Sequence, residues 1–176
     1  MIIGTFNPDV ETNIAAYFYG RSQNYLWRLL PRAFGEESLK TADRAAKRAF
    51  CVRRKIDFID LIAEVSRDRL SDFKDETIDG AITKWTDIDA AIRRAPNLRQ
   101  VAFTRKTFSG VLHIKRRWLE IKKRYENRFY TQALITPSRI YSEAKQNEWD
   151  EFIKSPPEID RAYSFNRFSL NRSKAV

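Results

Sequence analysis

Four short apolar segments alternate with helix-forming segments along this chain, and that alternation constrains the fold more than any other feature. The last three apolar segments are mostly continuous runs, which are typical of strands covered on both faces. Strands that alternate with helices predict a parallel sheet between two layers of helices. The predicted fold is therefore α/β, a three-layer α/β/α sandwich around a short four-stranded parallel sheet, with strands at 2–4, 56–62, 98–104 and 130–135.

Segments with helical spacing or composition lie between and after these strands. Thr86 to Asp89 has the pattern of a capping box and predicts the start of a short helix. The polar stretch 64–76 predicts a loop or an irregular segment. The other predicted helices cover 24–33, 39–50, 106–125 and 143–153.

The size and composition of the chain indicate one globular domain with a basic surface. With 176 residues, 43% hydrophobic and 13% aromatic, the chain is large enough to bury a full core. We expect a domain at 1–155 and a basic, aromatic C-terminal tail at 156–176. A net charge of +10 favours a polyanionic partner. A basic protein without such a partner is the alternative, which charge alone does not exclude.

The counts of cysteine and histidine exclude several kinds of metal site. Cys51 is the only cysteine and His113 the only histidine, so one chain contains no disulfide, no cysteine-ligated zinc or iron–sulfur site and no multi-histidine site. We expect Cys51 to be a core residue, His113 to have a structural or surface role, and the protein to need no metal or cofactor. No apolar run approaches the length of a bilayer span, and no signal-peptide pattern is present. We expect a cytoplasmic, nucleoid-associated monomer without a membrane partner.

The first strand ends in a turn and is followed by a segment rich in aromatic and amide side chains. Polar groups at the carboxyl end of a strand lie where open α/β sheets bind ligands. Asn7 has the donors and acceptor that would orient a water molecule, Tyr19 would stack on a base, and Arg21 would meet a phosphate. The alternatives are an ordinary turn at 4–9 and, for Trp27, a place in the core, which we favour.

The loops after the third and fourth strands carry further candidates for nucleic-acid binding. Lys106 stands at a strand-to-helix turn, where it would bind phosphate with the helix N-terminus. Thr136 and Ser138 supply hydroxyl groups and Arg139 a positive charge, whereas Ile140 and Tyr141 occupy a loop tip suited to a wedge in a base stack. A solvated basic turn and a common proline turn are the alternatives. The segment 105–128 adds nine Lys and Arg residues against Glu120 and Glu126, which favours phosphate binding.

Together these pieces resemble the uracil-DNA glycosylase superfamily, in particular its mismatch-specific and hypoxanthine-type branches. The resemblance covers most of residues 1–145. It rests on the order of five segments, GTFNP at 4–8, YGRSQNYLW at 19–27, IDFIDL at 56–61, FTRK at 103–106 and TPSRI at 136–140. It implies base excision without a metal, from a nucleotide flipped out of damaged or mismatched DNA.

The resemblance also implies roles for individual residues. Asn7 would orient the hydrolytic water, Phe6, Tyr19 and Asn24 would lie at the base, and Thr136 would contact the leaving group. Asn24 would either hold its loop or contact the base. Arg21, Lys106, Ser138, Arg139, Ile140 and Tyr141 would contact DNA.

The chain departs from the family pattern at two places. Thr5 and Phe6 both separate the glycine from Asn7 where relatives have one residue, which makes Asp9 a rival activator of the water. Thr136 stands where relatives carry Asn or His. The sequence thus predicts a glycosylase for uracil, hypoxanthine or mispaired thymine. The alternatives are an inactive nucleic-acid-binding protein on the same fold, and an interaction protein whose basic face binds RNA or acidic partners.

Overall fold

A four-stranded, entirely parallel sheet forms the centre of the protein. The computed structural model describes residues 1–7, 17–66 and 74–154, and all structural statements below concern these residues. The strand order is β2-β1-β5-β6. The predicted α/β fold with a four-stranded parallel sheet is confirmed, with strands β1 (Ile2–Gly4), β2 (Phe58–Asp60), β5 (Gln100–Phe103) and β6 (Tyr130–Ala133).

The two faces of the sheet support separate hydrophobic cores. Successive residues of a strand point to opposite faces. Ile3 and Phe103 accordingly enter one core, and Ile2 and Ala102 enter the other. Because both faces are covered, β5 is apolar on both sides, which explains its uninterrupted run in the sequence.

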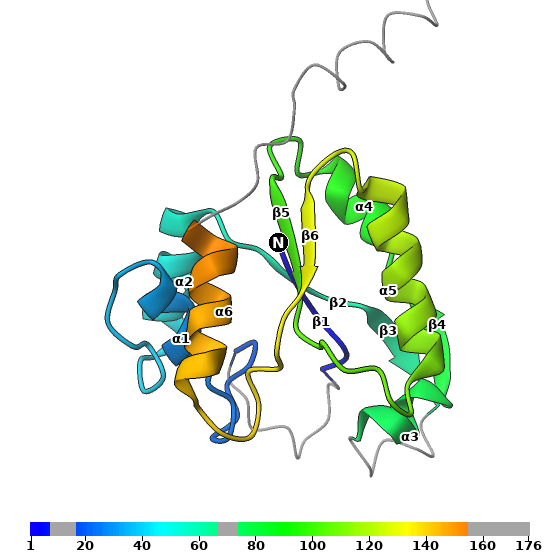
Figure 1. Ribbon diagram of the computed structural model, residues 1–176, viewed down its shortest axis with the longest axis horizontal. Helices are drawn as coiled ribbons and strands as arrows, with labels where there is room; N and C mark the ends of the chain where they lie inside the picture. The colour runs from blue at the N-terminus through cyan, green and yellow to red at the C-terminus, as the bar shows by residue number, and fades with distance from the viewer. Residues whose placement is uncertain (8–16, 67–73, 155–176) are drawn as a thin grey trace, which may run out of the picture.

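Helices cover both faces and complete the three layers (Figure 1). One face packs against α1 (Leu26–Ala33), α2 (Arg44–Arg54) and α6 (Glu143–Lys154). The other packs against α4 (Ile88–Arg93) and α5 (Leu112–Tyr125). The chain therefore leaves β1 toward one helical layer and leaves β5 toward the other.

A second, two-stranded sheet was not predicted from the sequence. β3 (Ile62–Val65) and β4 (Ile82–Trp85) pair antiparallel, and the short helix α3 (Asp75–Asp79) lies between them in the chain. The single predicted strand at 56–62 is in fact β2 and the start of β3. The predicted loop at 64–76 is wrong at both ends, because Val65 belongs to β3 and α3 begins at Asp75; residues 67–73 lie outside the described ranges.

The predicted starts of α1, α2, α4 and α5 are too early. Helix α1 begins at Leu26 rather than at 24, and α2 covers Arg44–Arg54 rather than 39–50, because the Asp43 carboxylate caps its first turn. The cap of α4 is Asp87 rather than Thr86, since the Asp87 carboxylate accepts the Ala90 N–H at 2.8 Å. Helix α5 begins at Leu112, and its first N–H groups are capped from another element. The carboxylate of Asp79 accepts the N–H groups of His113 at 3.0 Å and Ile114 at 2.7 Å.

Several residue-level predictions are settled by burial. Trp27 and Cys51 are buried in the core beneath α1 and α2, as predicted. His113 lies on α5 with an exposed side chain, and its ring contacts Asp79, which is a surface and structural role. No helix in the described ranges has the length and apolarity of a membrane span. The predicted tail at 156–176 lies outside the described residues.

We predict that Asp79→Ala destabilises the protein by about 2–4 kcal/mol, because three hydrogen bonds to a charged acceptor that is only 6% exposed disappear together. The matched control is Asp87→Ala, which removes one exposed N-cap bond and should cost about 1 kcal/mol. Urea unfolding of both variants measures the difference. Equal losses would show that the link from α3 to α5 adds no more to stability than one exposed N-cap.

Candidate functional site

The topology places a switch point between the carboxyl ends of β1 and β5, and we use the word crevice for this edge of the sheet, between Gly4 and Thr104. These strands are neighbours in the sheet, yet the chain leaves them toward opposite layers of helices (Figure 1). In open α/β sheets, ligands bind outside the carboxyl ends of strands at such a point. Gly4 ends β1 here, and Thr104 directly follows β5.

Gly4 allows two polar side chains to approach the backbone at this crevice. A Cβ atom at position 4 would lie 2.4 Å from the Asp60 Oδ1 and 2.7 Å from the Tyr19 hydroxyl oxygen. Both distances are shorter than real Cβ contacts, so any side chain at this position would displace these groups. The close approach of Asp60 and Tyr19 thus requires glycine at position 4.

The hydroxyl of Tyr19 is fixed beside Thr104 by hydrogen bonds. It lies 3.1 Å from the Thr104 hydroxyl, which in turn donates to the Ile3 carbonyl at 3.3 Å, so Tyr19 donates to Thr104. Burial raises the pKa of Tyr19, against the Thr104 hydrogen bond, and the nearby Asp60 charge raises it further. The phenol is therefore neutral at physiological pH. Its ring packs 5.8 Å from that of Phe58.

Asp60, at the end of β2, is the acidic group of the crevice. Burial raises the pKa of its carboxyl to about 6, although a hydrogen bond from the Asn7 backbone N–H acts in the opposite direction. At neutral pH the group is therefore mostly ionised but accepts a proton more readily than an ordinary aspartate. These are the properties of a general base.

An ion pair flanks the crevice on the side of α3. The Arg105 guanidinium, directly after Thr104, contacts the carboxylate of Asp75 and lies 3.2 Å from that of Glu76. Burial raises the pKa of Asp75, and the positive charge of Arg105 opposes that effect. The charge of Asp75 also acts on Tyr19, so this pair lies within electrostatic reach of the crevice.

The loop after β6 is joined to the segment before α1. The Asn24 amide donates to the Ser138 hydroxyl at 3.4 Å, and its Oδ1 accepts the Leu26 N–H at 2.9 Å. Two backbone bonds add to this contact, from Tyr25 N–H to the Pro137 carbonyl and from Arg139 N–H to the Gln23 carbonyl. Of the two roles left open for Asn24, the geometry favours holding the loop.

The side chain of Lys145 fixes the backbone at the tip of the same loop, and the side chain of Ile140 at this tip is exposed to solvent. The Lys145 ammonium donates to the carbonyls of Ser138 at 2.8 Å and Ile140 at 2.7 Å, on either side of Arg139, whose φ is 75°. The Ile140 side chain is 74% exposed. A β-branched apolar side chain is thus presented to solvent on a fixed backbone. The Thr136 hydroxyl accepts the Ser138 N–H at 3.3 Å, which leaves its own proton to donate elsewhere.

The remaining predicted residues lie in different environments. The Lys106 ammonium pairs with Glu148 of α6 at 2.8 Å, so it is not an unpaired phosphate ligand. Phe6 packs half-buried against the core beneath α4 and α5. Asn7 and Arg21 are exposed, and Asp9 lies outside the described residues. The roles proposed for all of these residues stay predictions.

Asp60 and Thr104 belong to the site but were not predicted from the sequence. Both occur inside segments that were assigned only as strands. For Thr104 the available signal was position, because it stands at the carboxyl end of a predicted strand, where ligands bind. Asp60 lay inside the strand predicted at 56–62 and comes to this edge because β2 ends at Asp60. Tyr19, which was predicted, is joined directly to Thr104. In the described residues, no group of three or more His, Cys, Asp and Glu side chains is arranged to hold a metal ion.

Comparison with known proteins gives no relative: no family model matches the chain, and no curated protein or solved structure is significantly similar. The resemblance to uracil-DNA glycosylases therefore rests on the motifs in the sequence.

We predict that Gly4→Ala destabilises the protein by about 1–3 kcal/mol, since the added methyl group would displace Asp60 and Tyr19. Gly80→Ala is the matched control, because the nearest atom to its added Cβ lies at 4.0 Å, and it should change stability by less than about 0.5 kcal/mol. Urea unfolding measures both. A neutral Gly4→Ala would contradict the close approach.

We predict that Asp60→Asn stabilises the protein above pH 6. The carboxyl has a pKa of about 6 in the folded protein against an ordinary value of 3.8. Ionisation of Asp60 therefore lowers the free energy of unfolding progressively as pH rises between these values. Since the group is half-buried, the gain should be about 1–3 kcal/mol at pH 7 and vanish below pH 4. Thermal unfolding of both proteins across this range measures it. A constant difference would show that ionisation of Asp60 is not the cause.

Proposed function

We propose that this protein is a monofunctional DNA N-glycosylase that flips out a deaminated or mismatched base and hydrolyses its N-glycosidic bond. The observation that carries the proposal is the ionisable carboxyl of Asp60 at the crevice between β1 and β5, beside the Tyr19 hydroxyl. A poised acid at the ligand-binding edge of an α/β sheet is typical of an active site. The motifs that resemble uracil-DNA glycosylases supply the substrate class.

In the proposed reaction, water attacks the anomeric carbon while the bond to the base nitrogen breaks. Asp60 takes the proton of the attacking water, and the base departs with the bonding electron pair and is protonated by solvent. A general base of this kind contributes roughly 100- to 10,000-fold to a rate. Asp60 thereby replaces the side chains of Asn7 and Asp9 as our first choice for the activator of the water. The backbone N–H of Asn7 orients its carboxylate.

The loop after β6 would act on the leaving base and on the DNA. The Thr136 hydroxyl keeps a proton that can be donated to a base oxygen, because its contact with Ser138 uses only a lone pair. Such a donor stabilises the charge that develops on the leaving group. The exposed Ile140 would fill the space that the flipped base vacates.

A second candidate function is binding of nucleic acid without catalysis. It is favoured by the contacts of the Tyr19 and Thr104 hydroxyls, which bond to each other and to the Ile3 carbonyl rather than facing an open slot. This function predicts affinity that falls with salt and no abasic product.

We predict that oligonucleotides carrying uracil, hypoxanthine or a mispaired thymine yield alkali-labile abasic sites with at least one of these bases. The single-turnover rate should rise with pH through about 6, as Asp60 loses its proton. Asp60→Asn should lower it by at least about 100-fold. The control Asp57→Asn removes an exposed carboxylate from the same segment and should leave the rate unchanged.

Two results would contradict this proposal in different ways. Intact binding with no abasic product from any substrate would favour the second candidate function. An Asp60→Asn variant with the wild-type rate and pH profile would show that Asp60 is not the general base.

A further inference from the structure

A cluster of positive charges and tyrosine rings lies on α1 and the two loops beside it. We call it the tyrosine–cation surface, and it consists of Tyr25, Arg28, Arg32, Lys40 and Tyr141. The Arg28 guanidinium lies 3.7 Å from the centre of the Tyr141 ring, and the Lys40 ammonium lies 3.5 Å from that of Tyr25. The two rings are themselves 6.2 Å apart. The five side chains therefore form one contiguous surface.

The charges on this surface are held in place by rings more than by acids. Arg28 and Lys40 make no ion pair with the described carboxylates, and their cation–π contacts fix their positions. Arg32 donates to the Tyr141 hydroxyl at 2.6 Å and lies near Asp150. The Tyr141 hydroxyl also donates to Glu143 at 2.9 Å. A cation that is already ordered loses less entropy when it binds an anion.

The surface adjoins the exposed loop tip. Tyr141 follows Ile140 directly, and the backbone of Tyr25 is bonded to that of Pro137 at 2.9 Å. Helix α1 runs from this edge along the face that carries α2 and α6 (Figure 1). The surface thus lies beside Ile140, the residue that the proposed function places against DNA.

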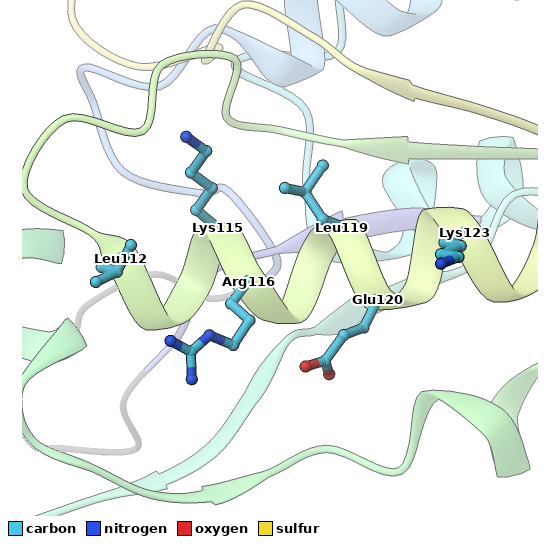
Figure 2. Close-up of a pocket in the computed structure, with 6 residues that line it drawn as sticks. All are labelled: Leu112, Lys115, Arg116, Leu119, Glu120 and Lys123. Atoms are coloured by element: carbon cyan, nitrogen blue, oxygen red, sulfur yellow. The ribbon is translucent and has the colours of Figure 1, made fainter.

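The other strongly basic surface, on α5, is built differently. Arg117 and Arg124 are paired with Glu120 and Asp89, respectively. Figure 2 shows that the exposed Lys115, Arg116 and Lys123 share a shallow hollow with apolar Leu112 and Leu119 and with Glu120. The leucines are 61% and 48% exposed.

The α5 surface suits a phosphate backbone less well. Leucine and glutamate interrupt its cations, and none of the side chains around the hollow is aromatic. Helix α5 also covers the opposite face of the sheet from α1 (Figure 1). One strand crossing the edge of the sheet would meet the two helices on opposite sides.

We propose that the tyrosine–cation surface binds the phosphodiester backbone of the nucleic-acid strand that enters the crevice, and that the α5 surface does not. This inference rests on the proposed function for the identity of the ligand. It differs from the expectation from the sequence that the charge run at 105–128 binds phosphate. Phosphate contacts dominate nucleic-acid affinity and make it depend on salt, with each neutralised phosphate adding to the slope.

The test compares two variants that each remove three positive charges. One is Arg28→Gln with Arg32→Gln and Lys40→Gln, and the other is Lys115→Gln with Arg116→Gln and Lys123→Gln. Fluorescence anisotropy with a labelled oligonucleotide, single-stranded and as a duplex, gives affinity at several salt concentrations. Because the oligonucleotide carries no damaged base, the measurement is independent of excision.

The α1 variant should bind at least about 10-fold more weakly, and the slope of log affinity against log salt should fall by about 2 to 3. The α5 variant should change affinity by less than about 3-fold. Replacing Arg28 and Arg32 by Lys, which keeps the charge, should preserve most of the slope. If urea unfolding shows that the triple α1 variant is not folded under the binding conditions, Arg28→Gln alone serves the same purpose and should lower the slope by about 1.

Equal losses from the two triple variants, or a larger loss from the α5 variant, would overturn the inference. The result is separable from the proposed function. If no base is excised but the α1 variant alone loses affinity, the surface assignment stands and the enzyme assignment fails. If bases are excised and the two variants bind alike, only the surface assignment fails.

Discussion

The absence of a side chain at Gly4 is the constraint on which the candidate site depends. Asp60 and Tyr19 occupy the space that a Cβ atom at that position would require. These two groups come from opposite directions, one from the end of β2 and one from the loop before α1. Because they meet over Gly4, they lie at the point where the chain leaves β1 and β5 toward different helical layers. The tight backbone turn and the chemical groups of the site are therefore one structural feature.

The core of the fold could be predicted because burial leaves a local trace in the sequence. Strands covered on both faces appear as apolar runs, and β5 and β6 lie within such runs. The β3–β4 sheet left no such trace, because Glu64 and Lys84 on its exposed side pair with each other at 2.7 Å and made the region look like a loop. The start of α5 was also unpredictable, because the capping carboxylate of Asp79 is 34 positions away from His113.

The site was only half predictable for a related reason. Tyr19 and the loop around Thr136 stood out because aromatic and hydroxyl residues cluster visibly in short segments. Asp60 did not stand out, since the pKa of an aspartate rises only when packing removes water from its carboxyl group. The residues next to Asp60 in the sequence do not reveal that packing. In the same way, the density of charge at 105–128 did not reveal that Arg117 and Arg124 form ion pairs with Glu120 and Asp89.

The electrostatics of Asp60 favour a functional role for this residue over a stabilising one. An acid whose pKa is raised by burial weakens the folded state at neutral pH, and no described lysine or arginine forms an ion pair with Asp60 to offset this cost. Asparagine would have nearly the same shape and would still accept the Asn7 N–H. A destabilising group that the packing does not require is typical of sites where chemistry sets the residue.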